Sequence, residues 1–282
     1  MKLSQAKILE LVRLKNEGKT TYFIRKKMGV SIRRINQLNG EYLSTGIIPR
    51  LKKPGRKAKP IDENETRLVC QASFEFRASA VFLEQIIKVK HGYKISHNRI
   101  HRILLQEGLA KRLGYMPRKK DWIRYERRHS LAAVHMDWHQ RADGKWVVLV
   151  EDDASRAILA MLECNSPTAE KSIEALQIAL QHGIIREVIT DHGSQFTSNR
   201  EGKSSFEEFC LEKDIKHILC RVKHPQSNGK IEKLFHLYKR WRDTFANGEE
   251  FVNWYNNIRP HLSLKFEELE TPWQAFLRKK RC

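Results

Sequence analysis

The excess positive charge of this 282-residue chain is confined to its first 130 residues. Residues 1–130 hold 31 Lys and Arg against 11 Asp and Glu, while residues 131–282 hold 22 of each. The formal net charge of +20 therefore belongs entirely to the first part of the chain. A basic segment of this size usually contacts a polyanion, most often nucleic acid. A generally basic, solvated protein is the alternative, but a uniform bias would not stop at residue 130.

Length and composition exclude several classes of protein. The chain is long enough for two or three modest domains with cores of their own. It has no apolar run of about 18 residues that would span a membrane, and its first residues lack the apolar region of a signal peptide. The cysteines are scattered and form no C-x-x-C pair, which favours free thiols, a cytoplasmic location and no structural zinc. They are Cys70, Cys164, Cys210, Cys220 and Cys282.

Residues 1–49 have the pattern of a helix-turn-helix module. Apolar residues recur at helical spacing over 5–15, 21–28 and 32–40, with Gly18 and Gly29 as stop signals between the segments. The third segment presents a polar face of side chains that suit the base edges of the major groove. These candidate DNA contacts are Arg33, Arg34, Asn36 and Gln37. An ordinary three-helix bundle with a polar outer face is the alternative.

Residues 50–61 are predicted to be a basic linker. Two prolines, a glycine and six positive charges within residues 50–60 cannot bury a core. Arg56 and Lys57 resemble the basic arms that enter a minor groove, although a merely solvated tether has the same composition.

Residues 62–110 repeat the pattern of the first module. Helices are expected over about 64–76, from about Val81 to Gly92, and over about 96–106. The last of these carries Asn98 and Arg102 on its outer face, which makes it a second candidate recognition helix. Residues 111–130 follow as a basic connector.

From Leu131 onward the sequence pattern changes to short apolar segments, which are typical of strands. Strands are expected near 134–139, 145–150, 157–162, 187–190 and 216–220, with helices near 168–182 and 206–211 and a long helix after Gly229. Asp143-Gly144 predicts a hairpin turn between the first two strands. Residues 131–246 thus predict an α/β domain built on a mixed sheet, and 247–282 a helical tail.

Three carboxylates in this domain come from three different elements. Asp137 lies within an apolar strand, Asp191 ends a strand at a glycine loop, and Glu232 lies in the first turn of the long helix. A carboxylate inside an apolar strand is costly unless it is paired or binds a metal, and oxygen ligands of this kind suit hard cations. Alternatively, each is a cap, a turn residue or a salt-bridge partner, as we expect for Asp152 and Asp153.

At these residues the chain resembles a known family. Residues 131–262 are similar to the catalytic core of retroviral integrases and insertion-sequence transposases, the DDE group with an RNase H-like fold. The matching motifs are Val134-His-Met-Asp137, Val188-Ile-Thr-Asp191-His-Gly-Ser-Gln-Phe196 and His224-Pro-Gln-Ser-Asn-Gly-Lys-Ile-Glu232-Lys. Tyr255-Asn-Asn-Ile-Arg-Pro-His261, with Thr271-Pro272, resembles the tail of such transposases.

The resemblance implies a fold, a metal site and roles for single residues. It implies helix-turn-helix modules followed by an RNase H-like core with a mixed five-stranded sheet. Asp137, Asp191 and Glu232 would hold two Mg²⁺ ions, for which Mn²⁺ could substitute. The residues expected near the DNA backbone at the cut are Gln226, Asn228, Lys230 and Lys233.

The departures from the family pattern are modest. Forty residues separate Asp191 from Glu232, somewhat more than is usual, and His192 stands where Asn or Arg is more common. Neither removes a ligand. The retroviral His-His-Cys-Cys zinc module is absent from the sequence, which favours a transposase over a retroviral enzyme.

The resemblance therefore implies a DNA transposase that cleaves the ends of a mobile element and joins the 3′ hydroxyls to target DNA. Its partner would be double-stranded DNA, on which it would act as a dimer or larger assembly, associated with the nucleoid and not with a membrane. A nuclease without strand transfer, or a non-catalytic DNA-binding regulator, would be the alternatives. We expect residues 1–110 alone to bind DNA with a steep dependence on salt.

Overall fold

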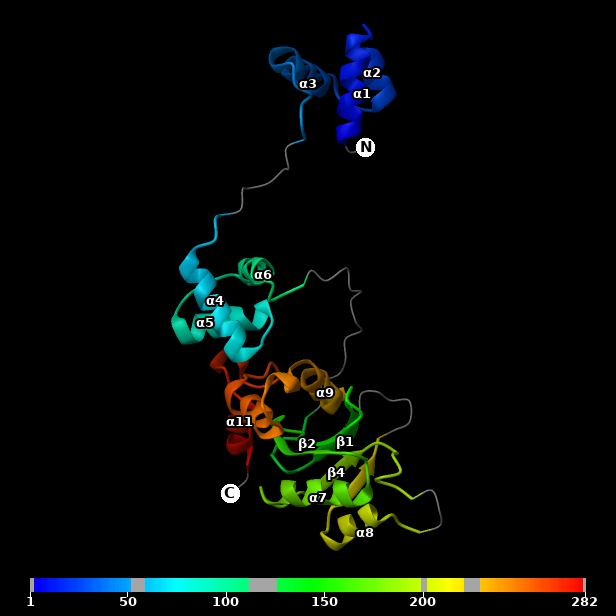
Figure 1. The fold of residues 1–282 in the computed structure, drawn as a ribbon, viewed down its shortest axis with the longest axis vertical. Coiled ribbons are helices and arrows are strands. Elements are labelled where there is room, and N and C mark those ends of the chain that lie inside the picture. The colour runs from blue at the N-terminus through cyan, green and yellow to red at the C-terminus, as the bar shows by residue number, and fades with distance from the viewer. Residues whose placement is uncertain (1–2, 52–58, 112–125, 199–201, 221–228, 281–282) are drawn as a thin grey trace. The chain divides into compact units, whose positions relative to one another are not determined.

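The computed structural model describes residues 3–51, 59–111, 126–198, 202–220 and 229–280. The chain divides into two compact units, residues 1–60 and residues 61–282, and each is described by itself. Figure 1 shows the helices of the first unit in blue and the first strands of the sheet of the second unit in green. None of the described helices is both long and apolar enough to cross a membrane.

The first unit consists of α1(Gln5–Asn16), α2(Thr21–Met28) and α3(Ile32–Thr45). Gly29 ends α2 in the left-handed conformation with φ 65°, which a residue with a side chain adopts only with strain. Ser31 then begins α3 by accepting a hydrogen bond from the Arg34 backbone N–H. The three helices enclose a core of their own, formed by Ile8, Leu11, Val12, Leu14, Ile24, Met28, Ile35 and Leu38. The predicted helices are confirmed, although α3 continues five residues beyond Gly40.

The second unit begins with α4(Glu63–Phe76), α5(Ala80–His91) and α6(His97–Gln106). Their buried side chains form a separate cluster around Phe76, Leu83 and Ile100. The Trp254 indole N–H donates to the Glu75 carbonyl oxygen at 2.9 Å, and this bond links the end of α4 to the C-terminal segment of the same unit. The helical nature of this segment is confirmed, whereas its assignment as a helix-turn-helix module stays a prediction.

The rest of the unit is built on a five-stranded sheet with the order β3-β2-β1-β4-β5. The strands are β1(Val134–Gln140), β2(Trp146–Asp152), β3(Ile158–Cys164), β4(Glu187–Thr190) and β5(Lys216–Leu219). β1, β2 and β3 pair antiparallel, whereas β4 is parallel to both β1 and β5. Gly144, with φ 85°, provides the turn of the first hairpin. The predicted mixed five-stranded sheet is confirmed.

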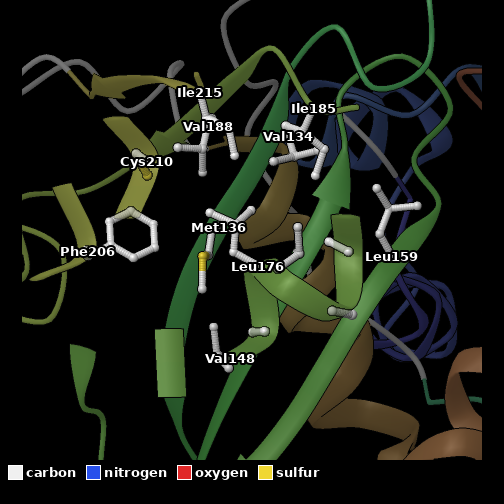
Figure 2. Packing of buried hydrophobic residues seen from close by; sticks show 14 of the residues in the cluster. Val134, Met136, Val148, Leu159, Leu176, Ile185, Val188, Phe206, Cys210 and Ile215 are labelled. Atoms are coloured by element: carbon white, nitrogen blue, oxygen red, sulfur yellow. The ribbon is translucent and has the colours of Figure 1, made fainter. Parts of the chain in front are cut away.

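Helices cover both faces of this sheet. On one face α7(Ala169–Leu180), α8(Ser205–Glu212) and α11(Pro272–Lys279) pack on the larger core cluster. Figure 2 shows Val134, Met136 and Val148 of that cluster together with Leu176 of α7 and Phe206 of α8. On the other face α9(Gly229–Trp241) and α10(Gly248–Asn253) pack on a second cluster. The sheet is buried on both sides because its strands alternate between these two clusters.

The C-terminal tail is helical only in part. α10 continues into a π-helical turn, η2(Trp254–Ile258), and the short η3(Phe266–Glu268) precedes α11. Residues 259–265, which lie between these elements, are irregular, and Pro260 is the physical reason because it lacks the N–H that a continued helix would need. The prediction of a helical tail therefore holds for its two ends and fails at its centre.

Candidate active site

The three predicted catalytic carboxylates come from β1, from the end of β4 and from α9. The register pairs His135 with Ile189 on parallel β1 and β4. It also pairs Thr190 with Leu219 on β4 and β5. Continuing both registers places Asp137, Asp191 and Cys220 at one level across three neighbouring strands. These positions face α9, since their alternate neighbours Val134 and Met136 belong to the core under α7.

The electrostatics of Cys220 indicate that all three carboxylates lie around this level of the sheet. Cys220 is buried, and burial raises the pKa of its thiol to about 11. Three carboxylates add to this rise through their negative charge: Asp137, Asp191 and Glu232. The helix that carries Glu232 reaches the same face, where the rings of His139 and Phe235 lie 5.3 Å apart between centroids.

Each aspartate is oriented by a backbone N–H close to it in sequence. The Trp138 N–H donates to Asp137 Oδ1 at 2.8 Å, and the Gly193 N–H donates to Asp191 Oδ1 at 3.0 Å. Both aspartates are half-buried, whereas Glu232 is exposed. His192, the departure from the family pattern, has Nε2 at 2.8 Å from the Cys220 carbonyl oxygen, so it links the loop after β4 to the end of β5.

Hard carboxylate oxygens fit a divalent cation such as Mg²⁺ by their chemistry. The three carboxylates are nevertheless not gathered into a complete set of metal ligands. Across the described part of the chain, no group of three or more His, Cys, Asp or Glu is arranged to hold a metal ion. The metal site therefore stays a prediction that rests on the donor type and on the shared face of the sheet.

A buried polar cluster lies on the same face, next to the carboxylates. We use this name for five side chains: His135, Glu151, Asp153, Arg156 and Lys230. The Asp153 carboxylate, with 1% of its surface exposed, has Oδ1 at 2.7 Å from His135 Nε2 and also bonded to Lys230 Nζ. Glu151 lies directly opposite His135 on β2. One atom of each of these two side chains, Glu151 Oε2 and His135 Nδ1, has no hydrogen-bond partner among the described residues.

Burial and charge shift the pKa values of this cluster in different directions. Burial raises the pKa of Glu151 to about 7, although Arg156 and Lys230 oppose the rise. Burial acts in the same sense on Asp153, but the bonds from His135 and Lys230 outweigh it and hold the pKa of Asp153 well below its usual range. The pKa of Lys230 is lowered by burial and by the charge of Arg156, despite Asp153. Lys230 therefore has two charged neighbours that shift its pKa in opposite directions, Arg156 and Asp153, and it bonds Asp153.

Asp152 and Asp153 have the turn and salt-bridge roles predicted for them. Asp152 accepts from the backbone N–H groups of Leu131 and Ser155, both at 2.8 Å, and Asp153 pairs with Lys230.

The predicted DNA contacts differ in their surroundings. Arg33, Asn36, Gln37, Asn98 and Lys233 are exposed, whereas Arg34, Arg102 and Lys230 are half-buried. Arg34 donates to Gln37 Oε1 at 2.7 Å, and Lys230 faces Asp153 rather than solvent. Arg56, Lys57, Gln226 and Asn228 lie outside the described residues.

Sequence reasoning did not identify the buried polar cluster, although part of the signal was there. Lys230 precedes the buried Leu234 and Tyr238 by four and eight residues, so helical spacing places it on the same inward face of α9. His135 likewise shares the alternation of Asp137 and His139 on β1. Glu151 had no comparable signal, because its burial depends on which helix covers β2.

Residues 127–225 match the family model described as the integrase core domain. This range contains Asp137 and Asp191 but ends before Glu232.

Three relatives were found by sequence comparison. An uncharacterized protein of Archaeoglobus fulgidus is 30% identical over 97 residues, which cover 34% of this chain and 78% of that protein. A putative integrase of Spiroplasma virus SpV1-C74 is 33% identical over 101 residues, 30% of this chain and 28% of the viral protein. The transposase for transposon Tn552 of Staphylococcus aureus is 27% identical over 161 residues, 53% of this chain and 32% of the transposase. The match thus spans a third or less of the last two proteins.

Proposed function

We propose that the chain, which belongs to the integrase and transposase family defined by the integrase core domain, is a DNA transposase. The family itself indicates DNA integration or transposition. We propose, more specifically, that the protein binds the ends of a mobile element, cleaves them and joins them to target DNA. The observation that supports this best is the shared face of Asp137, Asp191 and Glu232 around Cys220.

Asp137, Asp191 and Glu232 would hold two Mg²⁺ ions, or Mn²⁺ in their place. When bound, such a pair activates an attacking hydroxyl and stabilises the leaving oxygen of a phosphodiester. The chain's own contribution is orientation: the backbone N–H groups of Trp138 and Gly193 each donate to one oxygen of an aspartate and so orient its carboxylate.

The proposed reaction has two steps with the same geometry. Water attacks the phosphorus at the element's end, the bond to the 3′ oxygen breaks, and a 3′ hydroxyl and a 5′ phosphate result. That 3′ hydroxyl then attacks a target phosphodiester, and the target's own 3′ oxygen leaves. No side chain needs to form a covalent bond with DNA. Because two ends must be joined to one target, we propose that a dimer or larger assembly acts on the DNA.

A strand-transfer assay tests this proposal. Labelled duplexes containing the DNA that flanks the coding sequence on either side would be mixed with the protein and a supercoiled plasmid, with Mg²⁺ or with EDTA. Joined products that require Mg²⁺ are expected. Cleavage without joining would indicate a nuclease, and binding without either reaction would indicate a regulator.

Variants at the three carboxylates provide the residue-level test. Asp137→Asn, Asp191→Asn and Glu232→Gln should each lower cleavage by at least about a hundredfold, because each removes an oxygen ligand of the metal pair, with end binding within about twofold of the parent. Asp143→Asn, at an exposed aspartate in the β1–β2 turn, is the matched control and should cleave normally. If binding fell as much as cleavage, the metal-site assignment would be wrong.

A further inference from the structure

Lys230 lies in the first turn of α9 with its charge directed into the protein. Its side chain is 12% exposed, and Nζ bonds Asp153 Oδ1, on a carboxylate that is 1% exposed. A cation in the first turn of a helix opposes the helix dipole, and its burial costs further free energy. The local sequence therefore does not explain this orientation, whereas the tertiary partner Asp153 does.

Asp153 is itself held in place from several sides. His135 Nε2 lies 2.7 Å from Oδ1, and the Arg127 backbone N–H donates to Oδ2 at 2.6 Å. The Asp153 backbone N–H also donates to the Ala133 carbonyl oxygen at 3.0 Å. These bonds set the position of Asp153, so the Lys230 side chain has to reach Asp153 for the ion pair to form.

The same bonds connect the elements that carry two of the proposed metal ligands. His135 precedes Asp137 by two residues on β1 and shares its face, and Lys230 precedes Glu232 by two residues on α9. Two residues along a helix correspond to a rotation of about 200°, so Lys230 and Glu232 point to different sides of the first turn. Holding Lys230 on Asp153 therefore determines where Glu232 points.

The other end of α9 is held in a similar way. The Tyr238 hydroxyl donates to Glu163 Oε1 at 2.6 Å, and Arg242 Nε donates to the same oxygen at 2.7 Å. With its C-terminal end held by Glu163 of β3, the remaining freedom of α9 is at its first turn, where only Lys230 forms a buried ion pair among the described residues of that turn.

We infer that Lys230 is a positioning residue for Glu232 and not a DNA contact. Its ion pair with Asp153 sets the rotation and depth of the first turn of α9, and thereby the position of the Glu232 carboxylate relative to Asp137. This inference rests on the proposed function of Glu232 as a metal ligand.

The test compares four variants of the full chain: Lys230→Met, Asp153→Asn, the double variant, and Lys230→Arg as the conservative replacement. Lys171→Met is the matched control, because Lys171 also lies in the first turn of a helix and pairs with a carboxylate, but is 45% exposed. For each protein we would measure the single-turnover cleavage rate at saturating DNA, the DNA affinity as a function of salt, and Mn²⁺ binding by electron paramagnetic resonance. Urea unfolding would confirm that each variant is folded at the assay temperature.

Lys230→Met and Asp153→Asn should each slow cleavage at saturation by at least about tenfold and weaken Mn²⁺ binding, since a displaced ligand of this kind costs up to about a hundredfold. The double variant should be no slower than the slower single variant, because the two side chains act as one pair. Lys230→Arg should recover most of the rate, and Lys171→Met should match the parent.

A phosphate contact would give the opposite pattern. Lys230→Met would then weaken DNA binding and lower its salt slope by about one, with the rate at saturation unchanged. That result, or a slow Lys230→Met beside a normal Asp153→Asn, would overturn the inference. If the parent binds Mn²⁺ but does not cleave, the proposed function fails while the Mn²⁺ affinities of the variants still decide the role of Lys230. If the parent binds no Mn²⁺, both proposals fail.

Discussion

Glu151 shows how far a single side chain can depart from what its type suggests. It lies on β2 with 1% of its surface exposed and one oxygen without a hydrogen-bond partner among the described residues. Arg156 and Lys230 are near enough to oppose the rise in its pKa but do not cancel it. Burial favours the protonated form of this carboxyl group over the ionised form. Ionising Glu151 at neutral and higher pH therefore lowers the stability of the folded protein.

Glu151→Gln should therefore stabilise the protein in a pH-dependent way. The pKa of Glu151 is about 7 in the folded state against 4.5 as the ordinary value, so the folded state binds the proton more tightly. The stabilising contribution is complete below pH 4.5 and is lost as the pH rises through 7. The variant, which resembles the protonated form, should exceed the parent in free energy of unfolding by about 2 kcal/mol more at pH 8 than at pH 5.

Urea unfolding at the two pH values measures this difference. Glu212→Gln, at a glutamate that is 68% exposed, is the control and should show no such change with pH. A Glu151→Gln advantage that stayed constant between pH 5 and pH 8 would argue against the raised pKa.

At the scale of an element, α9 is held less by its own sequence than by carboxylates outside it. Glu163 on β3 accepts from Tyr238, from both Nε and Nη2 of Arg242, and from Arg141 in the turn after β1. Arg242 is 8% exposed, and Glu163 is the carboxylate that its guanidinium bonds among the described residues. The helix is amphipathic, and the apolar stripe places it on the sheet, but ionic contacts at its ends decide its exact position.

Glu163→Gln should lower the free energy of unfolding by about 2 kcal/mol, because it leaves the nearly buried Arg242 guanidinium without a charged acceptor. Asp243→Asn is the control: Asp243 also bonds Arg141, at 2.8 Å, but is 78% exposed and should change stability by less than about 0.5 kcal/mol. If the two substitutions lowered the free energy of unfolding equally in urea, the burial of Arg242 would not explain the effect of Glu163→Gln.

At the scale of the whole molecule, the two compact units have separate cores and different charge. Residues 1–60 hold 16 Lys and Arg against 3 Asp and Glu, and their apolar side chains pack on one another. The second unit contains the sheet and the proposed catalytic residues. A basic unit with its own core suits a division of labour in which DNA binding and chemistry belong to different parts of the chain.

A fragment of residues 1–60 should therefore fold alone and bind duplex DNA. Its circular dichroism should be helical, and its affinity should fall steeply between about 50 mM and 200 mM salt, as bound phosphates release their counterions. Fluorescence anisotropy with a labelled duplex measures this dependence. A folded fragment whose binding did not change with salt, or did not occur, would contradict a role in DNA binding.

Local patterns in the sequence are enough to predict the elements and the broad chemistry. Apolar periodicity and capping residues are local properties, so the helices of residues 1–110 and the five strands could be predicted from their own segments. The family motifs around Asp137, Asp191 and Glu232 could be recognised for the same reason, because each is a contiguous run. The irregular centre of the tail was not predicted, although Pro260 is a local signal against a continued helix.

The identity of the buried charged side chains, and of the groups that they face, follows from the packing of distant segments in the fold. Lys230, which the family resemblance places near the DNA backbone, bonds Asp153, a residue 77 positions earlier in the chain. Glu151 and His135 meet because β1 and β2 pair antiparallel and α9 covers that face of the sheet. Burial of a charge depends on contacts between segments far apart in sequence, and such contacts leave no periodic signal in any one of them.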